Sequence, residues 1–473
     1  MANTSDRSEF RFREYLGRLC GVAGHEDRRG PLEAYITGLC LPGERKSVEP
    51  MAARIDPRHV RARHQSMHHF VANAPWDEVA VLKVARDWVL DQMERHGAVA
   101  AWVIDDTGIP KKGSHSVGVA RQYCGALGKQ ENCQVAVSVS LANEAVSVPA
   151  AYRLYLPDAW ARDRQRRVAV GIPAEIGFRT KWEIALELIA ALQAEGLPPA
   201  PVVADAGYGD ATEFRDRLTA LRIPYLVGVK GATTVWRAGV QPLPPRPQGG
   251  PGRPPTRLRR TKRHRPVALN ALAHELPAAA WHPITWRQGT KGMMRSRFAW
   301  LRVRPAHRDE TLPRPREVEW LLMEWPRGEP EPTKFWLSTM PPATPASQLV
   351  RLAKLRWRIE RDYEELKSEF GLDHFEGRGW RGFHHHGTLC IAAYAFLAAE
   401  RARLSPPHPL SFLRPTRLPR GFTPRGSPGA AGASRGCVHR DPATAAIEGA
   451  PASPSLRLVR SPGSGRVGIF MTQ

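Results

Sequence analysis

Three acidic positions in this chain could assemble a metal-dependent site for phosphodiester chemistry. Asp105 and Asp106 end the apolar run VAAWVIDD, and Asp205 ends a second apolar run, PVVAD. Each run predicts a buried strand that delivers a carboxylate at its C-terminal end. Glu360 lies in RWRIERDYEELKSE, which has helical spacing. Carboxylates from three separate elements are hard oxygen ligands for Mg²⁺ and can hold two ions about 4 Å apart.

The first of these positions has two candidates, because Asp105 and Asp106 are adjacent. Consecutive strand residues project to opposite faces of a sheet, so the register of the strand decides which carboxylate faces the other acids. We predict Asp106 as the ligand and keep Asp105 as the alternative.

The glutamate should lie on one long helix from Arg351 to Gly371. Apolar residues recur there every three or four positions, Thr344 before Pro345 is typical of a helix start, and Gly371 is typical of a helix end. A polar stripe beside the apolar one contains Arg356, Glu360, Glu364 and Lys367. Helical spacing projects these four side chains the same way, as a ligand face or as a solvated face of ion pairs.

Three segments together resemble the DDE transposases of bacterial insertion sequences: IDDTG, VVADAGYGD and RWRIERDYEELKSE. The chain is most similar to the branch with a Tyr-x2-Arg-x3-Glu-x6-Lys signature, over roughly residues 33 to 400. The resemblance implies a ribonuclease H-like core with Asp106, Asp205 and Glu360 as metal ligands. It also implies that Arg356 and Lys367 handle the DNA end. Ala353 stands where the signature has tyrosine.

The charge of the chain points to a polyanionic partner. The 473 residues contain 69 basic and 46 acidic side chains, for a net charge of +23, and only 12 of the basic residues are lysines. Arginine suits bidentate phosphate contacts. We expect double-stranded DNA as the partner, both element ends and target, with Mg²⁺ or Mn²⁺ as cofactor and a homodimer in the DNA complex.

The sequence shows no feature of export or of membrane insertion. No run of 18 apolar residues occurs, the N-terminus lacks an apolar signal segment, and the six cysteines form no CxxC pair. We therefore expect a soluble protein of the bacterial cytoplasm, associated with the nucleoid, with reduced cysteines.

The order of predicted elements gives an α/β fold, a ribonuclease H-like mixed sheet flanked by helices. Residues 1–95 read as a helical N-terminal DNA-binding domain, and residues 96–230 with 345–400 as the catalytic core. In that core two alternating runs at 133–142 and 145–156 complete a three-stranded meander, and a helix at 180–195 leads to the Asp205 strand. Residues 231–344 read as a β-rich insertion, and residues 401–473, rich in proline and arginine, as a disordered basic tail.

Other basic residues are candidate DNA contacts. Lys111 and Lys112 follow the first aspartates in GIPKKGSHS, where a solvated loop is an equally good interpretation. The segment 241–266 is rich in proline, glycine and arginine, and we expect a mobile loop whose Arg259 and Arg260 grip the DNA backbone. For the three histidines at 384–386 we expect a DNA contact from a loop or helix start, since neighbouring residues cannot share one metal ion.

These observations favour a transposase that binds the ends of its element, cuts DNA and joins a 3′-hydroxyl to target DNA. Two alternatives stay open. One is a metal-dependent nuclease without strand transfer, and the other is a noncatalytic DNA-binding protein from a decayed element.

Overall fold

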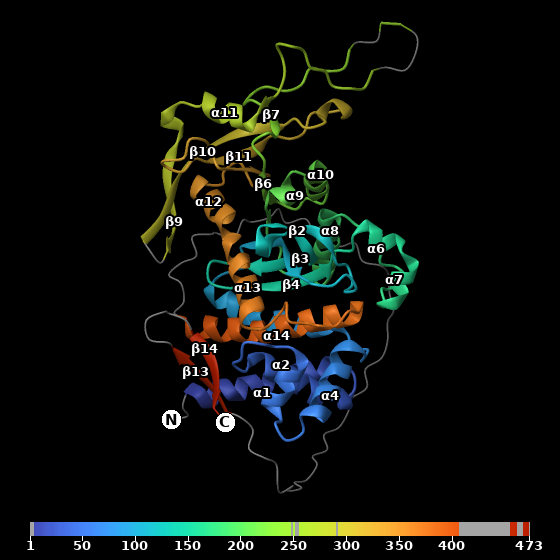
Figure 1. The fold of residues 1–473 in the computed structure, drawn as a ribbon. Helices are drawn as coiled ribbons and strands as arrows, with labels where there is room; N and C mark the ends of the chain where they lie inside the picture. The colour runs from blue at the N-terminus through green and yellow to red at the C-terminus, as the bar shows by residue number, and fades with distance from the viewer. Residues whose placement is uncertain are drawn as a thin grey trace, which may run out of the picture.

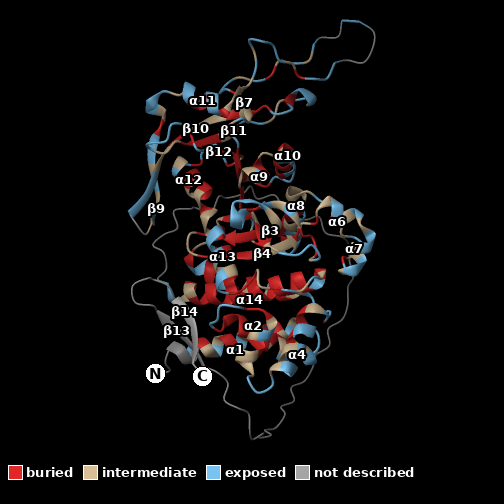
Figure 2. Ribbon diagram, viewed as in Figure 1, coloured by how far each residue is buried: buried red, intermediate tan, exposed pale blue. Residues whose placement is uncertain are grey.

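The computed structural model describes residues 4–246, 249–250, 255–289, 292–405, 455–460 and 467–472. Figure 1 shows the N-terminal helices at one end of the molecule, the central strands in the middle and a second group of strands at the other end. Figure 2 shows that buried residues fill the helical end and the central strands, and one hydrophobic cluster joins these two regions. Within the described ranges, no helix is both long and apolar enough to cross a membrane.

The N-terminal part is helical, as the sequence predicts. Its helices are Thr4–Val22 (α1), Arg29–Cys40 (α2), Val48–Ile55 (α3), Val60–Ala72 (α4) and Glu78–Met93 (α5). Helices α1, α2, α4 and α5 pack against α14 (Trp380–Leu404), which is buried over nearly its whole length, and α3 packs on α2 and α4. Because these helices share one core with the sheet, the assignment of residues 1–95 to a separate DNA-binding domain stays a prediction.

The central sheet has the predicted ribonuclease H-like succession. Its strands are Ala101–Pro110 (β1), Lys129–Ala142 (β3), Ser147–Leu154 (β4), Val202–Ala204 (β5) and Tyr225–Val229 (β6). The first three form the antiparallel meander, and β1, β5 and β6 are parallel neighbours. Helix Lys181–Ala194 (α8) leads from the meander to β5, and Ala206–Gly209 (α9) and Thr212–Ala220 (α10) connect β5 to β6. The prediction of a mixed α/β fold with helices flanking the sheet is confirmed.

Short elements accompany the meander and precede α8. Strand β2 (Ala120–Cys124) pairs with the first part of β3, and two short helices, Asp158–Arg162 (α6) and Arg164–Ala169 (α7), follow β4. At the start of α8, Thr180 and Glu183 form a capping box, which fixes where the helix begins.

The segment after β6 is rich in strands. It contains Thr234–Trp236 (β7), Val267–Ala268 (β8), His282–Gly289 (β9), Gly292–Pro305 (β10), Glu319–Glu324 (β11) and Lys334–Ser338 (β12), with a helix at Leu269–Glu275 (α11). Strand β12 pairs antiparallel with β6, so these strands continue the central sheet and do not form a detached barrel or sandwich. A second hydrophobic cluster lies in this part, around Val235, Leu269 and Leu337.

The predicted glutamate helix is two helices, Ala346–Leu355 (α12) and Trp357–Ser368 (α13), separated at Arg356. The prediction of one continuous helix is therefore wrong. At the break Ile359 N–H donates to the Arg356 carbonyl, a three-residue bond in place of the regular four-residue one. Thr344 does not cap the helix start, whereas Gly371 adopts the left-handed conformation expected of a terminating glycine (φ 64°).

The prediction that the three histidines contact DNA is wrong. His384, His385 and His386 lie inside α14 and are buried. Each ring bonds a backbone carbonyl, those of Trp380, Val71 and Gly371, at 2.9 to 3.1 Å. Burial lowers the pKa of all three imidazoles to about 4, so neutral rings serve as packing groups between α14 and its neighbours.

The predicted tail, 401–473, lies mostly outside the described residues. Helix α14 continues to Leu404, and two strands, Ser455–Arg460 (β13) and Val467–Thr472 (β14), pair antiparallel. The remainder of the segment for which disorder is predicted is not among the described residues.

Candidate active site

The middle of strand β1 presents two carboxylates to opposite faces of the sheet. The strand continues regularly through both residues in its register with β3 and ends at Pro110, so the aspartates are not at its end as predicted. Asp105 Oδ2 lies 2.8 Å from Arg356 Nη1, whereas the Asp106 carboxylate pairs with Lys181 at the start of α8. The two candidates for the first ligand thus have different cationic partners.

Asp205 stands level with Asp105 on the neighbouring strand. Val103 pairs with Val203 in the parallel register of β1 and β5, and each aspartate follows its valine by two residues. Residues at the same register on adjacent parallel strands project to the same face, with strands about 4.8 Å apart. Asp105 and Asp205 therefore form a pair of neighbouring carboxylates.

A close backbone contact between α9 and β6 fixes the position of Asp205. It caps α9, and its Oδ1 accepts a hydrogen bond of 2.9 Å from Gly207 N–H. A Cβ on Gly209 would lie 1.9 Å from the Gly228 carbonyl oxygen of β6, so only glycine lets α9 dock on that strand. The AGYGD sequence after β5 is thus the turn that holds the carboxylate in place.

Arg356, at the break between α12 and α13, bridges two of the predicted ligands. One nitrogen of its guanidinium reaches Asp105, and the other, Nη2, lies 2.5 Å from Glu360 Oε1. The Glu360 side chain is 57% exposed, so it is free to turn toward a ligand. The planar fork of arginine suits two carboxylates at once.

Burial and the neighbouring acids raise the proton affinity of Asp105. Burial raises the pKa of Asp105 to about 7; Arg356 acts in the opposite direction, and the charges of Asp205 and Asp106 raise the pKa further. A carboxylate that is buried among like charges is stabilised by any additional cation near it. The site is therefore electrostatically prepared for a further positive charge.

The donor chemistry fits a divalent metal. Asp105, Asp205 and Glu360 supply only carboxylate oxygens, which Mg²⁺ and Mn²⁺ prefer. Among the described side chains, no three histidine, cysteine or acidic groups are gathered closely enough to hold an ion as they stand. A side-chain rotation of exposed Glu360 from Arg356 toward the aspartates is what such a site would require.

Two of the lysines predicted to contact DNA are bonded to backbone. Lys367 Nζ donates to the Gly108 carbonyl of β1 at 2.9 Å, and Lys111 Nζ donates to the Phe375 carbonyl at 2.7 Å. Burial lowers the pKa of both ammonium groups. Lys112, by contrast, is exposed and can reach a phosphate without losing a partner.

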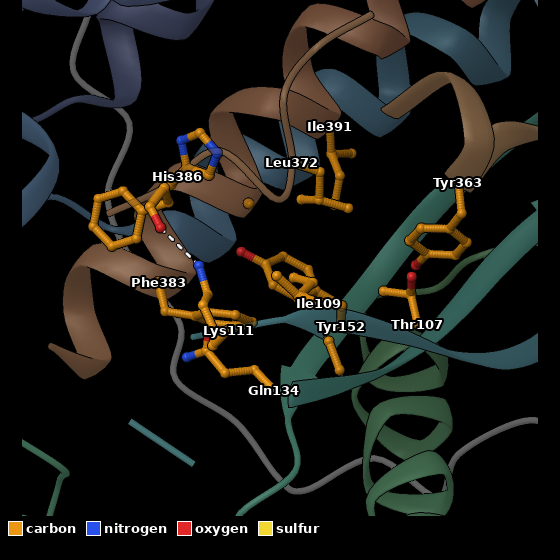
Figure 3. Close-up of a pocket in the computed structure, with 13 residues that line it drawn as sticks. Thr107, Ile109, Lys111, Gln134, Tyr152, Tyr363, Leu372, Phe383, His386 and Ile391 are labelled. Atoms are coloured by element: carbon orange, nitrogen blue, oxygen red, sulfur yellow. Dashed lines mark hydrogen bonds between the residues drawn. The ribbon is translucent and has the colours of Figure 1, made fainter. Parts of the chain in front are cut away.

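A cavity lies further along the Asp105 face of β1, between that strand and α14. Figure 3 shows Thr107, Ile109 and Tyr363 on one side and His386 and Ile391 on the other, with the ammonium of Lys111 bonded at its edge. Its volume of about 20 Å³ holds no more than a water molecule. It is a packing cavity and not a substrate site.

The basic segment 241–266 is partly fastened to the strands beside it; residues 247–248 and 251–254 lie outside the described residues. Arg259 Nε donates to the Pro244 carbonyl at 2.8 Å, and Arg260 pairs with buried Asp309. Among the described residues of this segment, Arg260 is exposed although it is paired, and the other exposed cations are Arg246, Arg257, Lys262, Arg263 and Arg265.

The sequence analysis missed two residues beside the carboxylates. Lys181 pairs with Asp106, and its place directly after the helix-capping Thr180 is the one signal that could have indicated it. Tyr208 is buried, and its hydroxyl has no hydrogen-bond partner among the described residues. Burial raises the Tyr208 pKa, and the charges of Asp106, Asp105 and Asp205 raise it further, which places the ring against the acidic cluster.

Comparison with known proteins gives two findings. The family model described as "DDE superfamily endonuclease" matches residues 15–293, more than half of the chain. A protein of Microchaete diplosiphon, "Probable transposase for insertion sequence element IS701", is 34% identical over 197 residues. That match covers 41% of this chain and 48% of the relative, so the chain spans about half of the relative's length.

Proposed function

The chain belongs to the DDE superfamily of endonucleases, and we propose that it is the transposase of an insertion sequence. In this proposal it binds the ends of the element, cuts the DNA and joins the freed 3′-hydroxyl to target DNA in a bacterial cytoplasm. The similarity to the probable transposase supports the assignment, and the net charge of +23 supports a DNA partner.

The observation that carries the proposal is the pairing of Asp105 with Asp205 in register, with Glu360 held nearby by Arg356. We assign these three carboxylates as the metal ligands. The sequence favoured Asp106 over Asp105. We prefer Asp105 because it shares Arg356 with Glu360, whereas Asp106 pairs with Lys181.

The metal ions and the residues around the site would have different roles in strand cleavage. Mg²⁺ or Mn²⁺, when bound, supplies activation of the attacking water or 3′-hydroxyl and stabilises the leaving oxygen. Arg356, once released from Glu360, can turn to a phosphate oxygen of the bound strand. Lys367 tethers α13 to β1 through Gly108 and so keeps the glutamate near the aspartates.

DNA would contact exposed cations on several elements. Lys112 lies beyond the acidic site on the chain following β1, and the basic segment contributes Arg257 and Lys262. Lys111, Arg259 and Arg260 are also candidates from sequence, although each is bonded within the protein. The two ends of an element are equivalent, so two copies of the chain, one on each end, would form a homodimer on the DNA.

A noncatalytic DNA-binding protein is the second candidate, and one observation favours it. Ala353 of α12 stands where the signature has tyrosine, and it is buried in the main hydrophobic core. The pairing of Asp105 with Asp205, with Glu360 held nearby by Arg356, opposes this candidate. A nuclease without strand transfer differs from a transposase only in what happens to the 3′-hydroxyl.

The test uses the DNA that flanks the gene. Terminal inverted repeats there would supply a substrate, and the purified chain with Mg²⁺ should cut at their ends and join them to a second duplex. Cutting without joining would indicate the nuclease. Binding without cutting, in Mg²⁺ or Mn²⁺, would contradict the proposed function.

A further inference from the structure

Tyr208 brings to the acidic site a hydroxyl that the proposed reaction does not use. It lies on α9, three residues after Asp205, and it is 2% exposed. Its ring packs in the main hydrophobic core, 6.1 Å from the ring of Phe214 on α10 between centroids. The hydroxyl at the end of this ring is buried and has no hydrogen-bond partner among the described residues.

A buried hydroxyl without a partner is unfavourable for folding. It gives up its hydrogen bonds to water and gains none in the protein, so it lowers the stability of the folded chain. Most buried polar groups of native proteins are paired, and an unpaired one calls for an explanation. By contrast, the hydroxyl of Tyr15 donates to the Ala392 carbonyl and that of Tyr225 donates to Glu319, both at 2.8 Å.

The turn that carries Tyr208 keeps the hydroxyl away from water. The next residue, Gly209, lies against β6, where a Cβ would approach the Gly228 carbonyl oxygen to 1.9 Å. The Gly209 carbonyl also accepts a hydrogen bond from buried Arg215 of α10. Because the backbone is fixed from two sides, the tyrosine ring stays where the fold places it.

The surroundings of the hydroxyl are acidic. Burial raises the pKa of Tyr208, and the charges of Asp106, Asp105 and Asp205 raise it further. The phenol therefore keeps its proton and can donate a hydrogen bond to a carboxylate. Since Lys181 already holds Asp106, we take the acceptor to be one of the two aspartates assigned as metal ligands.

In the structure these two aspartates bond other donors. Asp105 Oδ2 accepts from Arg356 at 2.8 Å, and its Oδ1 accepts from the next backbone N–H along the strand at 2.9 Å. Asp205 Oδ1 accepts from the Gly207 N–H at 2.9 Å. These bonds use oxygens that a divalent ion also requires, so the carboxylates must turn when they bind one.

We propose that Tyr208 is a positioning residue of the metal site, whose hydroxyl donates a hydrogen bond to Asp105 or Asp205 once these carboxylates bind a divalent ion. Carboxylates that bind a metal are themselves held by hydrogen bonds from neighbouring groups, which fix their orientation. Because the ring is already fixed, this bond is gained without ordering another side chain. The hydroxyl thus strengthens ion binding at a cost in stability.

This inference rests on the proposed function, from which it takes the metal ligands. Tyr208→Phe removes the hydroxyl and keeps the ring. In EDTA the full-length variant should resist denaturant at least as well as the wild type, because it buries no unpartnered oxygen. In a titration with Mn²⁺ alone, followed by the paramagnetic resonance of the free ion, its dissociation constant should rise about tenfold.

Tyr15→Phe is the matched control. The hydroxyl of Tyr15 joins α1 to α14 through its bond to Ala392, so its removal should lower the denaturation midpoint in EDTA and leave the affinity for Mn²⁺ unchanged. Asp105→Asn should abolish most Mn²⁺ binding, which ties the titration to the acidic site. On a duplex with the element's ends, Tyr208→Phe should cleave about tenfold more slowly at limiting Mn²⁺ and recover at saturating Mn²⁺.

The outcomes separate this inference from the proposed function. Weaker Mn²⁺ binding by Tyr208→Phe, in a chain that never cleaves DNA, would contradict the proposed function and support the positioning role. The positioning role is overturned if Tyr208→Phe and the wild type bind Mn²⁺ equally, or if the wild type binds none. It is also overturned if Tyr208→Phe loses stability in EDTA as Tyr15→Phe does, because the hydroxyl would then stabilise the fold.

Discussion

Helix α14 and helix α13 both carry titratable side chains, but these side chains have different surroundings and different roles. On α14 each histidine ring bonds a backbone carbonyl, and buried Glu400 accepts hydrogen bonds from Ser8 and Arg11. On α13 Glu360 is exposed and pairs with Arg356, which also pairs with Asp105. The buried groups of α14 are satisfied and stabilise the fold, whereas the acidic site keeps unbalanced charge, which is typical of a functional site.

We expect the largest effect, a loss of cleavage rate, from a substitution in the acidic site. Glu360→Gln should slow cleavage of DNA with the element's ends by at least about a hundredfold, because metal stabilisation of the transition state amounts to several kcal/mol. DNA binding should be nearly unchanged, since the amide has almost the same shape. Cleavage and binding measured on one substrate would separate the two effects.

Glu364→Gln is the matched control for that variant. Glu364 lies one turn further along α13 and is exposed, so its loss should change the cleavage rate little. Equal cleavage by Glu360→Gln and the wild type would show that the polar stripe of α13 is a solvated face of ion pairs and not a ligand face.

For a substitution on α14 we expect the opposite pattern, a loss of stability with no loss of cleavage rate. His386→Ala should lower the free energy of unfolding by about 2–4 kcal/mol, because it removes the bonds to Tyr35 (2.9 Å) and Gly371 (2.9 Å) and leaves a cavity. The cleavage rate per folded molecule should stay the same. Chemical denaturation measures the first quantity, and exposed His69→Ala should cost at most about 0.5 kcal/mol.

The same histidines predict a smaller, graded dependence of stability on pH. Their folded pKa is about 4 and their unfolded pKa is about 6.5, so below 6.5 the unfolded chain binds protons that the folded chain rejects. Stability should therefore fall as pH drops from about 6.5 to 4. His386→Ala should make the decline of the thermal midpoint shallower; an unchanged slope would show that other groups govern it.

Local patterns in the sequence were enough to predict the sheet. The apolar runs before Asp105 and Asp205 and the alternation at 133–142 describe the strands directly, because each strand's periodicity is set by its own residues. The spacing of Arg356 and Glu360 likewise predicted that their side chains would meet, and they do, although Arg356 precedes α13 and does not lie within a continuous helix. The family resemblance then supplied the order in which these elements meet.

Features that depend on distant partners could not be predicted. Which of Asp105 and Asp106 faces Asp205 depends on the pairing of β1 with β5, and the burial of the three histidines depends on helices more than 300 residues earlier. Helical periodicity continues on both sides of Arg356, so the sequence gives no sign of the break there. The partner of Asp106, Lys181, is 75 residues away in the chain.

The central claim is that Asp105, Asp205 and Glu360 form one site, and a direct comparison of two variants tests it. Asp105→Asn and Asp106→Asn should be measured for Mg²⁺-dependent cleavage of the same end-bearing duplex, with binding measured in parallel. We predict that Asp105→Asn loses at least about a hundredfold in rate, while Asp106→Asn, which alters only the pair with Lys181, retains most of it. Loss of cleavage in Asp106→Asn with near-normal cleavage in Asp105→Asn would contradict the account.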